Sequence, residues 1–288
     1  MAPSARPFLK WAGGKSQLLE QFEPLLPREL KEGKINTYVE PFLGAGAVFF
    51  HVAQRYTLKR AYLFDINAEL CLAYRVLKRA PRKLISSLEQ LQSTYLAATP
   101  SRREKLFYSV RGSYNASKAS VDYRTYHPDW VERAAQLIFL NKTCYNGLYR
   151  TNSRGEFNAP FGRYRNPSVF DPDNLARISR LLARAEIICD DFEKCEGAID
   201  GRTFVYFDPP YRPLSRTANF TSYSGGSFSD AEQRRLGMFY RRLHKQRHAR
   251  LMLSNSDPAN VNPNDSFFDE LYRGFSLNRV RAARMINS

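Results

Sequence analysis

The sequence predicts an α/β fold built on a mostly parallel β-sheet. Short apolar runs alternate with stretches of helical spacing, which is typical of successive strand and helix units. Several of the runs stop at acidic residues or at proline, and these residues interrupt regular structure. Ligands of such sheets bind beyond the carboxyl ends of the strands, so a functional site is expected there.

Five segments have the composition of strands. They are Thr37–Glu40, Ala61–Phe64, the segment around Ile187 and Ile188, Thr203–Phe207 and Leu251–Leu253. The fourth is the clearest, because a continuous apolar run is halted by Asp208-Pro209-Pro210.

Helices are expected between these strands. The apolar stretch Ala47–Ala53 follows the first strand, and Leu70, Tyr74 and Leu77 share one face of a helix after Asn67.

An insertion of different character, residues 81–185, separates the second and third strands. Its first half predicts helices, with Leu84, Leu88, Leu91 and Tyr95 at helical spacing. Its second half contains "NKTCYNGLYRTNSRGEFNAPFGRYRNPSVF", which is rich in Asn, Gly, Arg and aromatic residues. Such a segment is either an irregular connection or a surface made to meet a partner.

The charge of the chain points to nucleic acid. The 288 residues carry 44 Lys and Arg against 28 Asp and Glu, a formal net charge of +16. Residues 102–184 hold 15 basic and 7 acidic residues, and residues 234–250 hold 7 basic and none acidic. Clustered basic residues favour a phosphate-binding surface over a merely soluble basic one.

Other classes are disfavoured. No run of eighteen apolar residues is present, so a membrane span is not expected. The start, MAPSARPF, lacks the apolar core of a secretory signal, which predicts a cytoplasmic protein. Four cysteines without Cys-x-x-Cys spacing predict neither a metal site nor a disulfide framework.

The stretch "LKWAGGKSQL" nearly spells a phosphate-binding loop for ATP or GTP. That loop requires a glycine five positions before Gly-Lys-Ser, and Leu9 stands there. The stretch also starts too close to Met1 to follow a supporting strand. A nucleoside triphosphatase is therefore the least favoured function.

The turn Asp208-Pro209-Pro210-Tyr211 follows the fourth strand directly. Two prolines fix the backbone and remove two N–H donors, which leaves carbonyl groups without a local donor. Asp208 and the Pro209 carbonyl suit the amino group of a planar base on which Tyr211 stacks. The alternative is a strand end closed by a Pro-Pro turn and a capping aspartate.

A glycine-containing loop, "EPFLGAG", follows the first strand. Gly44 and Gly46 permit close backbone approach, although Phe49 replaces the third glycine of a dinucleotide-binding loop. Asp65 lies at the next strand end, where a carboxylate of nucleotide-binding sheets typically forms hydrogen bonds with the ribose hydroxyls. The pair indicates a nucleoside cofactor without pyrophosphate; the alternative for Asp65 is a helix cap.

Together these motifs resemble the D12 class of Dam-like, alpha-group DNA adenine-N6 methyltransferases, over almost the whole chain. The matching motifs are "FLKWAGGK", "EPFLGAGAVFF", "FDIN", "NKTCYNGLYRTNSRGEFNAPFGRY", "DF" at 191–192 and "VYFDPPYRPLSRTANFTSY". The resemblance implies a Rossmann-like class I methyltransferase sheet, formed by residues 1–80 and 186–288. Residues 81–185 would form an inserted, mainly helical target-recognition domain that binds DNA.

The resemblance also implies S-adenosylmethionine as cofactor and a set of residues around it. Asp65 would bind the ribose, Asp191 and Phe192 would flank the adenine, and Asp208 would lie beside the methionine part and the target amine. The other implied cofactor contacts are Trp11, Lys15, Glu40, Phe42, Gly44 and Gly46. Asp208, Pro209, Pro210 and Tyr211 would form the catalytic turn.

For double-stranded DNA the resemblance implies a recognition hairpin between Asn141 and Tyr164. Arg150 would read a guanine edge, Leu148 and Pro160 would contact thymine methyl groups, Tyr145 would wedge into the base stack and Asn146 would touch the backbone. GATC is the expected target, and the adenine must be flipped out. Residues 219–221, Asn-Phe-Thr, are expected to close over it.

Two alternatives stay open at this point: a non-catalytic DNA-binding protein and an RNA methyltransferase on the same fold. The chain stops at "VRAARMINS", whereas family members usually continue through a basic, glycine-containing loop into a closing strand. Either the protein is truncated or that segment is missing from this sequence, and the completeness of the sheet stays open. A cognate restriction endonuclease acting separately and a monomer or weak dimer are further expectations.

Overall fold

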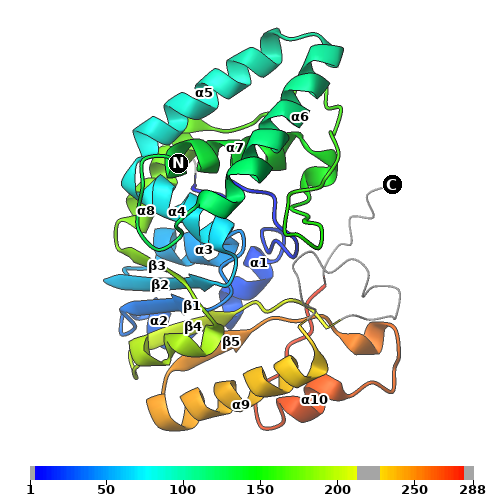
Figure 1. Cartoon of the computed structure of the whole chain (residues 1–288). Helices are drawn as coiled ribbons and strands as arrows, with labels where there is room; N and C mark the ends of the chain where they lie inside the picture. The colour runs from blue at the N-terminus through cyan, green and yellow to red at the C-terminus, as the bar shows by residue number, and fades with distance from the viewer. Residues whose placement is uncertain (1–3, 213–227, 282–288) are drawn as a thin grey trace.

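Five parallel strands form the centre of the computed structural model, which describes residues 4–212 and 228–281 (Figure 1). The strands are β1 (Thr37–Glu40), β2 (Arg60–Asp65), β3 (Ala185–Cys189), β4 (Thr203–Phe207) and β5 (Arg250–Leu253). Their order is β3-β2-β1-β4-β5, and each neighbouring pair runs parallel. All five predicted strands are confirmed.

Helices cover both faces of this sheet (Figure 1). On one face lie α3 (Ala47–Arg55), α4 (Ala68–Arg79) and α8 (Pro172–Leu182), and on the other lies α9 (Asp230–Arg247). The two predicted helices are α3 and α4, and the predicted face of α4 is buried at Leu70, Tyr74 and Leu77. The shorter elements are α1 (Leu19–Phe22), α2 (Arg28–Lys31), α10 (Phe267–Leu271) and the 3-10 turns η1 (Glu23–Leu25), η2 (Ser117–Ser120), η3 (Tyr145–Gly147), η4 (Phe192–Ala198) and η6 (Pro258–Asn260).

The predicted insertion, residues 81–185, begins as helices, continues as a hairpin and ends with α8, which packs on the sheet rather than with the other inserted helices alone. Its helices are α5 (Pro81–Ala97), α6 (Pro100–Ala116) and α7 (Trp130–Thr143), which stack beyond α4 and α8 in Figure 1. Leu84, Leu88 and Tyr95 are fully buried along α5, as their spacing predicts. Residues 144–161 then fold back on themselves, with bridges from Cys144 to Phe161 and from Thr151 to Phe157.

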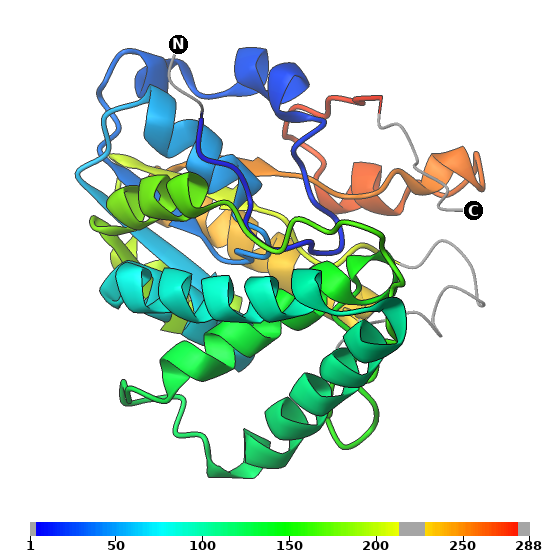
Figure 2. The same ribbon diagram turned by 90° about the horizontal axis from the view of Figure 1, so that it is seen from above.

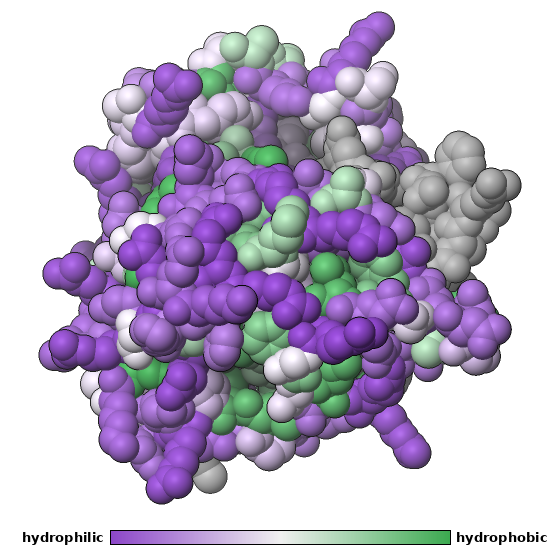
Figure 3. Space-filling model, turned by 90° about the horizontal axis from the view of Figure 1, so that it is seen from below, coloured by the Kyte–Doolittle hydropathy of each residue, from purple (hydrophilic) through white to green (hydrophobic). Residues whose placement is uncertain are grey.

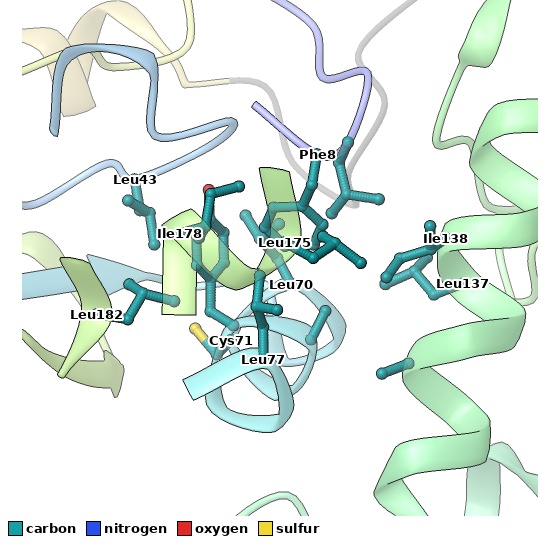
Figure 4. Close-up of a cluster of buried hydrophobic side chains, with 14 of the residues drawn as sticks. Phe8, Leu43, Leu70, Cys71, Leu77, Leu137, Ile138, Leu175, Ile178 and Leu182 are labelled. Atoms are coloured by element: carbon teal, nitrogen blue, oxygen red, sulfur yellow. The ribbon is translucent and has the colours of Figure 1, made fainter. Parts of the chain in front are cut away.

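One hydrophobic core joins the sheet helices to the insertion. Figure 4 shows side chains from α4, α7 and α8 pointing toward one another, with Phe8 of the N-terminal segment among them. The joint also contains a buried ion pair, in which Arg133 of α7 donates from Nε to Glu69 of α4 at 2.9 Å. Because removing one partner of a buried pair costs about 3–5 kcal/mol, this pair fixes α7 firmly against α4.

The basic run 234–250, which spans most of α9 and the start of β5, differs from what its composition suggests. Figure 3 shows the lower face of the molecule, largely covered by hydrophilic side chains. Arg235, Arg242, Arg247 and Arg250 all form ion pairs, with Asp191, Glu193, Glu196 and Glu29 among their partners. Four of the 7 basic residues between 234 and 250 are therefore neutralised within the protein.

Among residues 4–212 and 228–281, no helix combines the length and the apolar composition needed to cross a membrane.

Candidate active site

The predicted cofactor and catalytic segments meet at the carboxyl ends of β1, β2 and β4. The strand order reverses between β1 and β4, because the chain builds the sheet toward β3 on one side and toward β5 on the other. Ligands of α/β sheets bind beyond the strand ends at such a reversal. The loop after β1, Asp65 after β2 and Asp208 after β4 lie there, and the N-terminal segment brings Lys15 to the same point.

A buried ion pair joins the first and last of these segments. Lys15 Nζ lies 2.6 Å from Oδ1 and 2.7 Å from Oδ2 of Asp208, and it also donates to the Gly13 carbonyl at 2.6 Å. Lys15 is 3% exposed, so its charge is almost wholly withdrawn from water. Ser254, just after β5, donates to Asp208 Oδ1 at 3.0 Å and pairs with the Tyr206 hydroxyl at 2.8 Å.

Burial and charge act in opposite directions on this pair. Burial raises the pKa of Asp208 above its ordinary value, while Lys15 and the Ser254 hydrogen bond hold it down. Burial alone would lower the pKa of Lys15, but Asp208 and Tyr211 together outweigh it and the net pKa is raised. Lys15 therefore stays protonated and stabilises the ionised form of Asp208.

The turn after Asp208 is held from helix α9. Pro209 is buried, and the Pro210 carbonyl accepts a hydrogen bond of 3.0 Å from Gln233 Nε2. The sequence predicts carbonyls without a local donor, but α9 packs beside β4 and supplies a donor 23 residues later in the chain. The Tyr211 ring centroid lies 4.7 Å from Lys15 Nζ, a cation–π distance. Residues 219–221 lie outside the described part of the chain.

The glycine loop after β1 is bound to Asp65. Gly44 and Gly46 have positive φ angles of 49° and 68°, which glycine adopts at low cost. The Gly44 N–H donates to Asp65 Oδ2 at 3.0 Å, and the Asn67 N–H donates to Asp65 Oδ1 at 2.9 Å. Asn67 is the cap of α4, since its side chain accepts from Glu69 and Leu70. The alternative of Asp65 as a helix cap is therefore wrong.

Glu40 lies beneath this loop and is 2% exposed. Its Oε2 accepts a hydrogen bond of 2.8 Å from the Tyr38 hydroxyl. Burial raises the pKa of Glu40 well above its ordinary value, and the nearby Asp208 carboxylate adds to that shift.

An aromatic wall stands beside the loop. The Phe42 and Phe192 ring centroids are 5.3 Å apart, and Phe228 packs against both. Asp191 caps η4 by accepting from Glu193 N–H at 3.0 Å, and it forms an ion pair with Arg235. The aspartate is thus held by two partners inside the protein.

Trp11 connects the glycine loop to the hairpin. Its Cδ1 lies 3.3 Å from the point that a Cβ on Gly44 would occupy. On its other side the indole stacks on Tyr149, with ring centroids 5.1 Å apart and planes inclined by 23°.

The hairpin places the predicted DNA contacts together. Tyr145 is 51% exposed, and its N–H donates to the carbonyl of Pro160 at 2.8 Å. Asn146 has a positive φ of 55° and donates its N–H to the Tyr164 hydroxyl at 2.9 Å. Leu148 is half-buried, and Arg150 and Pro160 are exposed.

Arg150 is oriented before any ligand binds. Its Nε donates to Asn158 Oδ1 at 2.8 Å, and its terminal nitrogen donates to the Asn158 carbonyl at 3.2 Å. Asn158 thereby joins the two arms of the hairpin through the guanidinium.

Sequence analysis does not identify three residues of this site: Gln233, Ser254 and Asn158. Of these, Gln233 could have been found from the sequence, because it is a polar residue on the face of α9 that Leu236 and Tyr240 bury. Ser254 and Asn158 act on partners 46 and 8 residues away, and their surroundings carry no pattern.

A cavity of about 390 Å³ lies elsewhere, among the end of α3, the start of β2 and the end of α8. Four arginines line it, Arg55, Arg60, Arg180 and Arg184, together with apolar residues such as Leu58 and Leu181. It contains none of the predicted site residues. Within the part of the chain that the structure describes, no group of three His, Cys, Asp or Glu side chains could hold a metal ion.

The arrangement can bind a nucleoside and a base side by side. Asp65 offers acceptor capacity for hydroxyl groups, and Asp208 offers it for an amino group. Backbone N–H groups of Gly44 and Asn67 bind Asp65, whereas the Lys15 ammonium group and the Ser254 hydroxyl bind Asp208. The Trp11–Tyr149 stack links the glycine loop to the exposed hairpin.

Comparison with known proteins gives one family. The model of the D12 class N6 adenine-specific DNA methyltransferases matches residues 11–286. That range contains all the site residues discussed above.

Curated relatives align over nearly the full chain. The Type II methyltransferase M.MjaIII of Methanocaldococcus jannaschii is 50% identical over 282 residues, which cover 98% of this chain and 93% of the relative. The Type II methyltransferase M1.LlaDCHI of Lactococcus lactis subsp. cremoris is 37% identical, covering 97% and 88%. The DNA adenine methylase of Escherichia coli K12 is 34% identical, covering 98% and 90%.

Proposed function

The chain belongs to the D12 class of N6 adenine-specific DNA methyltransferases, and on that premise we propose that it uses S-adenosylmethionine to methylate an adenine flipped out of duplex DNA. GATC is the proposed target. The family favours this DNA enzyme over a non-catalytic DNA-binding protein and over an RNA methyltransferase.

One observation carries the proposal: Asp208 stands at the carboxyl end of β4, next to the point where the strand order reverses, and is held there by Lys15 and Ser254. A carboxylate fixed at a strand end in this way retains acceptor capacity for a ligand with N–H donors. An adenine amino group suits it, because that group carries two such donors.

The residues around the glycine loop fit S-adenosylmethionine. Each Asp65 oxygen accepts one backbone hydrogen bond and retains acceptor capacity for a ribose hydroxyl. Trp11, Phe42 and Phe192 offer ring faces to the adenine and to the sulfonium cation, and the carboxylates favour that positive charge. When bound, this cofactor would supply an electrophilic methyl group.

Asp208 and the Pro209 carbonyl would accept the two hydrogen bonds of the adenine N6 amino group. That nitrogen is a weak nucleophile, since its lone pair is delocalised into the ring. Two acceptors placed around N6 favour a tetrahedral nitrogen, which directs the lone pair out of the ring plane. They also stabilise the positive charge that develops on nitrogen. Tyr211 would stack on the flipped base.

Lys15 would orient Asp208 and keep it ionised. Because Lys15 and Ser254 each occupy part of the carboxylate, the free lone pairs point in a restricted direction. Lys15 also lies over the Tyr211 ring. Its ammonium group would therefore position both residues proposed to contact the flipped adenine, Asp208 and Tyr211.

We assign DNA recognition to the insertion, residues 81–185, and catalysis to residues 1–80 and 186–288. Arg150 would bind O6 and N7 of a guanine, and Leu148 and Pro160 would contact thymine methyl groups. Tyr145 would fill the gap left by the flipped adenine, at a cost of about a few kcal/mol for unstacking. Asn146 would contact the backbone.

We infer action in the cytoplasm, as a monomer or weak dimer, with a restriction endonuclease of the same specificity as a separate partner.

The proposal is tested by sequencing single DNA molecules from cells that lack other adenine methylation and express this chain. N6-methyladenine confined to GATC is the expected result. Methylated adenine in another sequence context would overturn the target, and the absence of N6-methyladenine would overturn the activity in this chain.

A further inference from the structure

Trp11 is enclosed by two elements with different proposed tasks. One edge of the indole packs against Gly44, in the loop assigned to the cofactor. One face stacks on Tyr149, which precedes the proposed base reader Arg150. The glycine and the indole lie close together, since a Cβ at Gly44 would be only 3.3 Å from Trp11 Cδ1 and any side chain there would crowd the ring.

Tyr149 is anchored in the hairpin on its other side. Its ring packs against Phe157 with centroids 5.9 Å apart, and Phe157 is buried. Burial raises the pKa of Tyr149 to about 12, and Glu69 acts in the same direction, so the phenol is neutral at physiological pH. The next residue after Phe157 is Asn158, which holds the Arg150 guanidinium.

These contacts form one continuous chain of packed groups. Asp65 binds the Gly44 N–H, Gly44 packs on Trp11, and Trp11 stacks on Tyr149. Tyr149 and Phe157 then pair across the hairpin arms whose next residues, Arg150 and Asn158, are hydrogen-bonded.

We propose that Tyr149 is a positioning residue that couples occupancy of the cofactor site to the reading of DNA by Arg150. The inference rests on the proposed function and deepens it. A cofactor that packs on Trp11 and Asp65 would limit the motion of the glycine loop and of the indole. Because Tyr149 is stacked on that indole, the motion of the hairpin would be limited as well. By thermodynamic linkage, specific DNA must then strengthen cofactor binding by the same factor.

The test measures coupling rather than activity. The dissociation constant of a labelled GATC duplex is determined by fluorescence anisotropy, with and without saturating S-adenosylhomocysteine, which has no methyl group to transfer. We expect the wild-type ratio to be about 5-fold or more, the lower end of typical allosteric coupling. Tyr149→Leu should bring the ratio close to one, and Tyr149→Phe should keep it because the stacked ring remains.

A matched control removes the tyrosine next to the other tryptophan of the chain. Tyr126 contacts Trp130 with ring centroids 5.6 Å apart, away from Trp11. Tyr126→Leu should leave the ratio at its wild-type value. Tyr149→Gln serves as a second variant if circular dichroism shows that Tyr149→Leu does not fold.

Two results would overturn the inference while leaving the proposed function intact. They are a Tyr149→Leu or Tyr149→Gln protein with the wild-type ratio, and a wild-type protein that methylates GATC but shows no coupling. A wild-type protein that binds neither S-adenosylhomocysteine nor duplex DNA would instead overturn the proposed function, and the inference with it.

Discussion

Gln233 Nε2 donates a hydrogen bond of 3.0 Å to the carbonyl oxygen of Pro210, and so helix α9 fixes the turn that follows Asp208. Gln233 is completely buried, and its Oε1 accepts from Asn255 Nδ2 at 3.1 Å. One amide thus joins the turn after β4 to the segment after β5.

Replacing Gln233 with Leu should lower kcat more than it changes KM for DNA. The Pro210 carbonyl would lose its donor, and the turn would hold Asp208 less accurately. We expect a loss of about 10-fold in kcat. We also expect a loss of about 0.5–1.5 kcal/mol of stability for each of the two hydrogen bonds that the Gln233 amide makes. Steady-state kinetics and thermal unfolding check this. Gln246→Leu, an exposed change in the same helix, is the control, and equal effects of the two changes would contradict the assignment.

Gly46→Ala should destabilise the protein and weaken cofactor binding. An ideal Cβ there would lie 2.7 Å from the Tyr74 hydroxyl, and the φ of 68° already disfavours alanine. Gly33→Ala separates the two effects, because Gly33 has a similar φ of 71° and nothing within 4 Å. We expect a cost of about 1–2 kcal/mol at Gly33 and a larger cost at Gly46. Chemical denaturation measures both, and equal costs would show that the contact with Tyr74 is unimportant.

Arg150→Ala should reduce methylation and relax base preference at the guanine position. The guanidinium is already oriented by Asn158, so its removal should cost about 1–3 kcal/mol of discrimination, roughly 5- to 150-fold. Competition between GATC and substituted duplexes measures this. Arg154→Ala removes one exposed arginine from the same hairpin and should leave base preference unchanged. An Arg150 variant with wild-type preference would remove this residue from base reading.

Lys15→Met should move the acidic limb of the pH–rate profile to higher pH. Burial raises the pKa of Asp208, and Lys15 opposes that rise. Without the lysine the folded-state pKa must rise further, so the ionised carboxylate needed for catalysis is lost at a higher pH on acidification. Single-turnover rates with saturating cofactor and DNA check this. A slower variant whose acidic limb has not moved would mean that Lys15 does not control the ionisation of Asp208.

Ionisation also governs stability near Asp208. A carboxyl group whose pKa is raised in the folded state binds its proton more tightly when folded. Its contribution is therefore most favourable at low pH and is lost as pH rises from the unfolded pKa to the folded one. Removing Lys15 should enlarge that loss.

The sequence predicts the sheet and the catalytic turn because their signals are local. Thr203–Phe207 is apolar throughout and ends at two prolines, and Gly46 precedes a helical pattern, so each element is specified within a few residues. Asp208 and Lys15 are 193 positions apart in the chain, and only the family resemblance anticipates that they lie side by side.

Long-range partners explain what the sequence does not reveal. The basic composition of α9 resembles a phosphate-binding surface, yet Arg235 pairs with Asp191, 44 residues earlier. The Trp11–Tyr149 stack likewise joins segments that share no local pattern. Both depend on how the sheet brings separate segments together, which composition and periodicity do not encode.

The role of Asp208 is tested most directly by the single-turnover rate of methylation of a GATC duplex by Asp208→Asn, with saturating S-adenosylmethionine. Asparagine keeps the size of the side chain but removes the negative charge, so we expect the rate to fall by about 100-fold or more. Asp265→Asn, which alters a carboxylate paired with Arg212, should stay near the wild-type rate. A folded Asp208→Asn protein that methylates at the wild-type rate would contradict the account.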